Sequence, residues 1–156
     1  MKDWTGNSKS VYSVLGASSH SNTERQSEDY YATPSIAVEK LLEKEKFSFF
    51  ILEPCCGEGH ISKILKEHGY SVWSSDLIDR GYGDEFGDFL VMNDSNARDI
   101  ITNPPYALAY DFVEHALDIS EDDVKVAMLL KIQFLEGKKR RKLFEKYPPR
   151  TCVCVF

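Results

Sequence analysis

The residues best suited to chemistry in this chain are Asn103, Pro104, Pro105 and Tyr106, which directly follow the apolar-ending run 97–102. Both prolines fix φ and lack a backbone N–H, and the carbonyls of Asn103 and Pro104 can accept hydrogen bonds from a ligand. Tyr106 supplies a flat ring on which a planar group can stack. Together these residues would hold the exocyclic amino group of a flat substrate. A tight proline turn with a core-packing tyrosine is the alternative that the motif alone leaves open.

A glycine-rich stretch, Gly57-Glu58-Gly59, lies upstream between a predicted strand and a predicted helix. The bare backbone of glycine lets a ligand approach closely. A dinucleotide fingerprint would need a third glycine, where this chain has Ser62. The carboxylates of Glu53 and Glu58 would repel a pyrophosphate and suit a cationic ligand. A simple strand-to-helix turn remains the other interpretation of this stretch.

Two further acidic positions come after predicted strands. Asp76 ends the second strand, 17 positions after Gly59, where a carboxylate can accept hydrogen bonds from both hydroxyls of a ribose. Asp88 and Phe89 follow a third candidate strand, where a carboxylate could accept an adenine amino proton and an aromatic ring could line the base. Asp76 could equally be a helix cap or face solvent.

The elements that must position these residues alternate between strands and helices. Apolar periodicity predicts helices over 35–45, 60–68, 109–119 and 138–147, and strands over 47–52, 70–75, 98–102, 124–130 and 151–156. The segment 81–88 is predicted as loop, and 89–91 as a short strand or turn. Such alternation indicates an α/β protein with a parallel sheet, and ligands bind such sheets at the carboxyl ends of the strands. The loops 53–59, 76 and 103–106 all fall at that edge.

The length of 156 residues and the hydrophobic content of 42% suit one domain with a real core. We expect residues 1–28 to form an irregular arm, and residues 29–156 to form the domain. No apolar run approaches the ~20 residues that span a bilayer, and the first residues lack the apolar stretch of a signal peptide. We therefore expect a cytoplasmic protein.

The four cysteines, Cys55, Cys56, Cys152 and Cys154, have poor zinc spacing. The last two alternate with valines as in a buried strand. We expect no metal site, and we expect all four to be reduced, small core residues.

The charge is distributed unevenly along the chain. The net charge is -6, yet residues 131–150 carry eight basic side chains against two acidic ones. This basic end could form a solvated helix face or contact phosphates.

The order of Glu-x-x-x-Gly-x-Gly at 53–59, Asp76, Asp88-Phe89 and Asn-Pro-Pro-Tyr at 103–106 resembles the S-adenosylmethionine-dependent amino-methyltransferases. It resembles in particular that of small phage and bacterial DNA adenine-N6 methyltransferases, and residues 29–34 fit their upstream motif. The resemblance covers about residues 15–147. It implies a Rossmann-like methyltransferase fold with a mostly parallel sheet flanked by helices. It also implies methyl transfer from S-adenosylmethionine to the N6 amino group of adenine in double-stranded DNA, in a bacterial or phage-infected cell.

The resemblance also implies a role for each matching residue. The cofactor-binding residues would be Tyr31, Thr33, Pro34, Glu53, Pro54, Gly57, Gly59, Asp76, Asp88 and Phe89. The catalytic loop would comprise Asn103, Pro104, Pro105 and Tyr106, with the target base flipped out of the duplex and stacked on the tyrosine. The nucleic-acid contacts would be Lys138, Lys139, Arg140 and Arg141.

The family usually ends in a β-hairpin whose last strand is antiparallel to the sheet, whereas this sequence stops at Phe156. We therefore expect an incomplete hairpin with an exposed edge, and a monomer or weak homodimer. Alternatives are a methyltransferase for RNA adenine or a protein glutamine amide, and a cofactor-binding pseudo-enzyme that binds nucleic acid. A nicotinamide oxidoreductase is disfavoured by the missing third glycine and the acidic loop.

Overall fold

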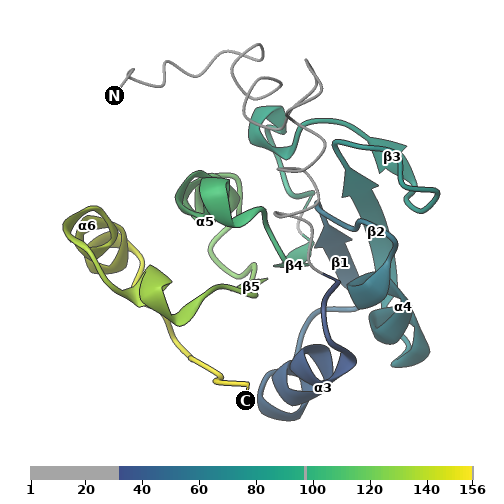
Figure 1. Ribbon diagram of the computed structural model, residues 1–156, viewed down its shortest axis with the longest axis horizontal. Coiled ribbons are helices and arrows are strands. Elements are labelled where there is room, and N and C mark those ends of the chain that lie inside the picture. Colours follow the sequence, from purple (N-terminus) through teal and green to yellow (C-terminus); the bar gives the residue numbers. More distant parts are fainter. Residues whose placement is uncertain (1–31, 97, 156) are drawn as a thin grey trace. The chain divides into compact units, whose positions relative to one another are not determined.

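The computed structural model describes residues 32–96 and 98–155 (Figure 1). The predicted arm 1–28 and the predicted cofactor contact Tyr31 lie outside these residues.

The centre of the described chain is a five-stranded sheet in which every pairing is parallel. Its strands are β1 (Phe50–Glu53), β2 (Ser71–Asp76), β3 (Glu85–Phe86), β4 (Asp99–Thr102) and β5 (Val126–Met128), in the order β3-β2-β1-β4-β5. The chain thus moves outward from β1 to β3, then crosses back to place β4 on the other side of β1. The predicted α/β class with a parallel sheet is confirmed, and the architecture is compatible with a Rossmann-like fold.

The described residues form four α-helices, each close to its predicted range: α3 (Ser35–Lys44), α4 (His60–Glu67), α5 (Ala109–Asp118) and α6 (Lys138–Lys146). Ile61 and Leu65 of α4 lie one turn apart and pack on Ile51 of β1 and Val72 of β2, with Val38 of α3 in the same cluster. Leu52 and Ile100 alternate with these positions and therefore point to the opposite face of the sheet. Side chains packed on both faces of the sheet thus hold β1 between β2 and β4.

Three short 3-10 turns complete the described elements: η1 (Phe89–Val91), η2 (Tyr106–Leu108) and η3 (Ile132–Leu135). Residues 89–91 thus form a 3-10 turn, where a short strand or turn was expected. The segment predicted as loop contains the two-residue strand β3. Asp84 holds this strand against β2, because its Oδ2 accepts a hydrogen bond from Ser74 N at 2.8 Å. The bond between Ser74 and Asp84 depends on how the loop folds back on β2, and it leaves no periodic signal in the sequence.

The predicted final strand, 151–156, is wrong for the residues that the structure describes there. Residues 151–155 have no strand partner, and Cys152 and Cys154 are exposed where buried core residues were expected. Glu45 draws this segment beside the end of α3 (Figure 1), through an ion pair with Arg150 at 3.4 Å and a hydrogen bond from Thr151 Oγ1 at 2.6 Å. A segment with alternating apolar residues forms a strand only where it can pair with the edge of a sheet.

No helix within the described residues is both long and apolar enough to cross a membrane.

Candidate functional site

The candidate site lies where the order of strands reverses, between β1 and β4. In open parallel sheets the loops on either side of such a reversal diverge and leave a crevice for ligands. Here these loops are residues 54–59 after β1 and residues 103–106 after β4. Asp76 ends β2, the other neighbour of β1. The three loops selected from the sequence therefore meet at one edge of the sheet, as predicted.

Asp76 ties the glycine-rich loop to the end of β2. Its Oδ2 accepts a hydrogen bond from Gly57 N at 2.8 Å, and its Oδ1 accepts one from Ile78 N at 3.0 Å. Cys56 N also donates to Ser75 O at 2.9 Å, so two bonds hold the loop in place. A carboxylate oxygen has two lone pairs and can accept a second bond, so Asp76 can brace the loop and still receive hydroxyl donors.

Glu53 is sealed inside the protein at the carboxyl end of β1, with 1% of its surface exposed. Ser62 of α4 donates a hydrogen bond to its Oε2, and the Ser62 and Ser74 hydroxyl oxygens lie 2.6 Å apart. Burial raises the pKa of Glu53 to about 8, with the nearby Asp76 charge adding to the shift. Ser62 stands where a dinucleotide fingerprint would have its third glycine. It thus donates to a carboxyl group that is largely neutral at pH 7. A positive ligand nearby would favour its ionised form.

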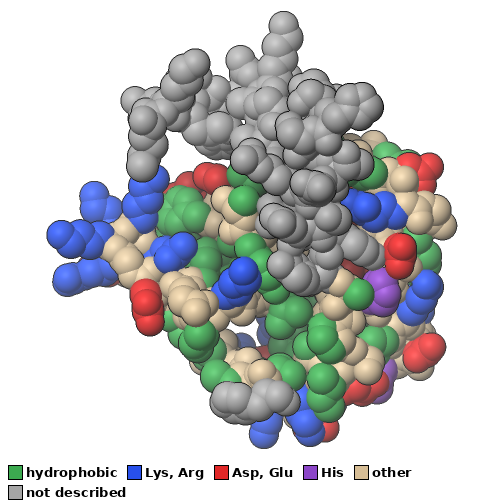
Figure 2. Space-filling view, viewed as in Figure 1, with side chains coloured by type: hydrophobic (Ala, Val, Ile, Leu, Met, Phe, Trp, Pro, Cys, Tyr) green, Lys and Arg blue, Asp and Glu red, His purple; other side chains and the backbone are tan. Residues whose placement is uncertain are grey.

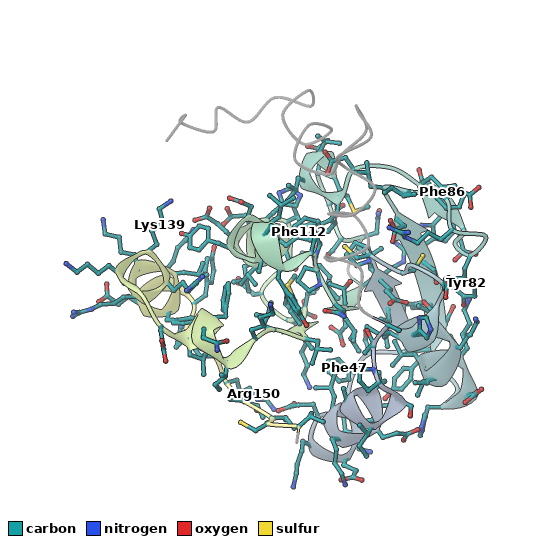
Figure 3. All side chains as sticks on the ribbon, in the orientation of Figure 1. Phe47, Tyr82, Phe86, Phe112, Lys139 and Arg150 are labelled. Carbon is teal, nitrogen blue, oxygen red and sulfur yellow. The ribbon has the colours of Figure 1, made fainter. Side chains whose placement is uncertain are left out.

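Tyr82 covers Gly59, a contact that sequence reasoning missed. Gly59 has φ +81°, and a Cβ there would lie 2.5 Å from the Tyr82 ring, which Figure 3 labels. The ammonium groups of Lys63 and Lys66 lie 5.1 and 5.3 Å from the ring centroid. The close approach that requires a glycine at 59 is therefore made by the protein's own tyrosine. The one sequence signal for Tyr82 is its position between two glycines, Gly81 and Gly83.

Thr33 and Asn103 meet across 70 positions of sequence. Asn103 Nδ2 donates to Thr33 Oγ1 at 3.1 Å, and Thr33 is 8% exposed. Pro34, the next residue, is the N-cap of α3 and leads directly into that helix. The structure thus brings the upstream motif to the catalytic-loop candidate, although nothing in the spacing indicated that these two side chains would touch.

The rest of the Asn-Pro-Pro-Tyr motif forms a firm turn. Pro104 is buried, and the Pro105 carbonyl accepts a hydrogen bond from Leu108 N at 3.0 Å, which opens η2. Tyr106 is only half-buried, and Lys131 Nζ lies 4.7 Å from the centroid of its ring. The ring therefore meets a charged group at the protein surface and is not a core-packing tyrosine.

Asp88 and Phe89 hold the chain after β3 in a local turn. Asp88 Oδ1 accepts a hydrogen bond from Leu90 N at 2.9 Å and so caps η1. Phe89 is 3% exposed, with its ring centroid 5.3 Å from that of Phe112 and 5.0 Å from that of His115, both in α5. A ligand ring could reach Phe89 only by displacing this packing.

The adjacent cysteines of the glycine-rich loop are poor nucleophiles. Burial raises the pKa of the Cys55 thiol well above its usual value and that of Cys56 to about 12, and the negative charge of Asp76 adds to both shifts. Both thiols are therefore protonated at neutral pH, and the thiolate is the reactive form. Within residues 32–96 and 98–155, no group of three or more His, Cys, Asp or Glu side chains converges as metal ligands.

The basic helix α6 is highly charged at its surface, where Figure 2 shows Lys and Arg side chains gathered. Of its four predicted phosphate contacts, two have local roles. The Arg140 guanidinium lies 4.8 Å from the Phe134 ring centroid, and its Nη1 donates to the carbonyls of Gln133 and Glu136. Arg141 pairs with Glu145 at 2.9 Å. Lys138 and Lys139 are exposed, and Lys139 extends outward in Figure 3.

The chain matches no protein-family model and no curated protein sequence. The residues at this edge of the sheet combine a glycine-rich loop and the Asp76 carboxylate, after β1 and β2, with a turn after β4 that carries hydrogen-bond acceptors and an aromatic ring. Such a site can bind a cationic ligand beside a flat, amino-bearing group.

Proposed function

We propose that this protein transfers the methyl group of S-adenosylmethionine to the N6 amino group of adenine in DNA. One observation carries the proposal: the Asn103–Tyr106 turn lies beside the 54–59 loop at the reversal of strand order. A cofactor held by one loop and a planar amine held by the other would then be neighbours. Positioning two reactants in this way can supply much of the rate acceleration of a transfer reaction.

The residues after β1 and β2 have the chemistry to hold S-adenosylmethionine. Asp76 has lone pairs for ribose hydroxyls beyond its bonds to Gly57 and Ile78. Glu53 would respond to the positive charge of the ligand by ionising, since its pKa of about 8 lies close to neutral pH. When bound, the cofactor would supply a methyl group on a positively charged sulfur, which keeps the electron pair of the broken C–S bond.

The residues after β4 would act on the amine. The Asn103 side chain and the Pro104 carbonyl would accept hydrogen bonds from the amino group, which favours a more tetrahedral nitrogen with a lone pair directed at the methyl group. Thr33 would fix the orientation of the Asn103 amide through their 3.1 Å hydrogen bond. Tyr106 would stack on the base, which must leave the duplex because N6 is inaccessible within it. The amino group would release one proton to solvent.

The test is to incubate the purified protein with methyl-labelled S-adenosylmethionine and unmethylated DNA, with RNA and a protein mixture in parallel. We expect label in DNA as N6-methyladenine. Asn103→Ala should abolish the label, while Asn93→Ala, an exposed asparagine before β4, should leave it unchanged. Label in RNA or in protein alone would contradict the DNA assignment, and equal label with Asn103→Ala would remove the catalytic role of the turn.

A further inference from the structure

We propose that Lys131 binds the phosphate of the nucleotide whose base stacks on Tyr106, and so selects an anionic, nucleotide substrate at this turn. The inference rests on the proposed function, which it deepens by assigning the substrate's phosphate to a named residue. It also favours a nucleic acid over a protein amide, because an amide side chain carries no phosphate for the lysine to meet.

The backbone holds Lys131 in place beside the turn. Leu129 N donates to the carbonyl of Thr102, the residue before Asn103, at 3.0 Å. On its other side Lys131 is the N-cap of η3, whose Phe134 is 6% exposed and packs with Ala109 and Leu143. The lysine backbone is thus fixed at both ends, while the side chain itself is exposed.

The ammonium of Lys131 occupies a position that a nucleotide could take over. Its Nζ lies 4.7 Å from the Tyr106 ring centroid, within the range of a cation–π contact. A base stacked on an aromatic ring contributes more binding free energy than an exposed cation–π contact, so stacking can displace the ammonium from the ring. The flexible stem then lets the displaced ammonium reach a phosphate while the backbone stays in place.

The electrostatic surroundings of Lys131 favour an anion. None of the ion pairs formed among the described residues involves Lys131. The exposed Lys138 and Lys139 belong to α6, which packs through Leu143 against Ala109 at the start of α5. Because α5 begins directly after η2, α6 lies on the Tyr106 side of the site. Phosphates flanking the stacked base would therefore meet further positive charge.

The test compares Lys131→Met, which keeps the length of the stem but removes the charge, with Lys131→Arg, which keeps the charge. Lys44→Met, on the exposed last turn of α3, is the matched control for an equal loss of charge elsewhere. The ligands are adenosine and adenosine 5′-monophosphate, titrated by calorimetry. A single-stranded oligodeoxynucleotide is then titrated over a series of salt concentrations.

We expect the wild type, Lys131→Arg and Lys44→Met to bind the monophosphate several-fold more tightly than adenosine. Lys131→Met should lose this preference without losing affinity for adenosine. Its salt dependence on single-stranded DNA should also fall by about 0.7 in the slope of log K against log salt, the value for one phosphate contact. In methylation assays its KM for DNA should rise while its kcat remains close to the wild-type value.

A Lys131→Met variant that retains the phosphate preference and the salt slope would overturn the inference, as would a wild type that prefers adenosine. Both results concern binding and do not depend on turnover, so they are distinguishable from a failure of the proposed function. The latter would appear as absence of N6-methyladenine from DNA treated with the wild type.

Discussion

The side-chain amide of Asn103 donates a hydrogen bond to the hydroxyl of Thr33 at 3.1 Å, which joins the entry to α3 to the loop after β4. Thr33 is buried, and Asn103 is half-buried. An amide that acts on a substrate must present its carbonyl oxygen and its NH2 group in a fixed order. The hydrogen bond to Thr33 fixes which side of the Asn103 amide carries the oxygen. Thr33 itself would not touch the target amine.

Replacing Thr33 with Val should therefore impair catalysis while preserving the fold. Valine has nearly the same shape as threonine but cannot accept the Asn103 bond. A neutral hydrogen bond contributes about 0.5–1.5 kcal/mol, so we expect the rate of methyl transfer at saturating cofactor to fall up to roughly tenfold. Thr33→Ser keeps the hydroxyl and should remain close to wild type. Equal rates for the Val and Ser variants would argue that Thr33 does not orient the amide.

The buried carboxyl of Glu53 should make stability depend on pH. Its folded-state pKa is raised to about 8 from the ordinary 4.5, so the folded protein binds the proton more tightly than the unfolded chain. The stabilising effect is complete below pH 4.5 and is lost as the pH rises toward 8. The loss should approach about 1.4 kcal/mol per pH unit within that window.

Urea unfolding at pH 5 and pH 8 measures this effect, with Glu53→Gln as the comparison. Glutamine can still accept the Ser62 hydrogen bond but does not titrate. We expect the free energy of unfolding to decrease with pH more steeply in the wild type than in Glu53→Gln. Parallel pH profiles for the two proteins would mean that Glu53 is ionised across the whole range.

Gly59→Ala should destabilise the protein more than Gly69→Ala. Both glycines have positive φ, +81° and +88°, but only a Cβ at 59 would meet the Tyr82 ring, and nothing lies within 4 Å of one at 69. The backbone strain alone costs roughly 1–2 kcal/mol, and overpacking typically adds a further 1–3 kcal/mol.

Thermal or urea unfolding of both variants, alone and combined with Tyr82→Ala, separates the two causes. We expect the excess cost at position 59 to shrink in the Tyr82→Ala background, while the cost at 69 stays the same. Equal losses at the two positions would show that Tyr82 moves aside without penalty.

Asp76→Asn should weaken binding of S-adenosylmethionine. The amide retains one acceptor oxygen but presents an NH2 group where a carboxylate oxygen now accepts from Gly57 or Ile78. Hydrogen bonds to a charged group contribute about 1.5–3 kcal/mol, so we expect a roughly tenfold to hundredfold loss of affinity by calorimetry. Asp79→Asn, in the exposed loop three residues on, is the control and should bind normally. Unchanged affinity of Asp76→Asn would limit Asp76 to bracing the loop.

The order of the four described helices and of strands β1, β2, β4 and β5 was predictable from the sequence, as was the edge that carries the candidate site. Local periodicity decides these features: Ile61 and Leu65 mark one face of α4, and an apolar run marks β1. Because strands alternate with helices, the sheet is parallel and the loops after its strands lie together. The positions of Asp76 and of Asn103–Tyr106 at that edge followed directly.

The predicted final strand was wrong because a contact between distant segments overrode a local pattern. The alternating residues 151–155 suggested a strand, but Glu45 draws Arg150 and Thr151 beside α3. The roles of Phe89 and Arg140 stay predictions, but the sequence did not indicate their contacts within the protein. Phe89 lies against Phe112 and His115 of α5. The Arg140 guanidinium donates to the carbonyls of Gln133 and Glu136.

By itself, the sequence determined the class of fold, the edge of the sheet that carries the candidate site, and the residue types present there. These depend on short-range periodicity and on turn chemistry, which the order of residues encodes directly. Only the tertiary structure decided which side chains meet: Thr33 with Asn103, Tyr82 with Gly59, Lys131 with Tyr106. Such pairs depend on how segments far apart in the chain pack against each other, and that packing depends on the whole core.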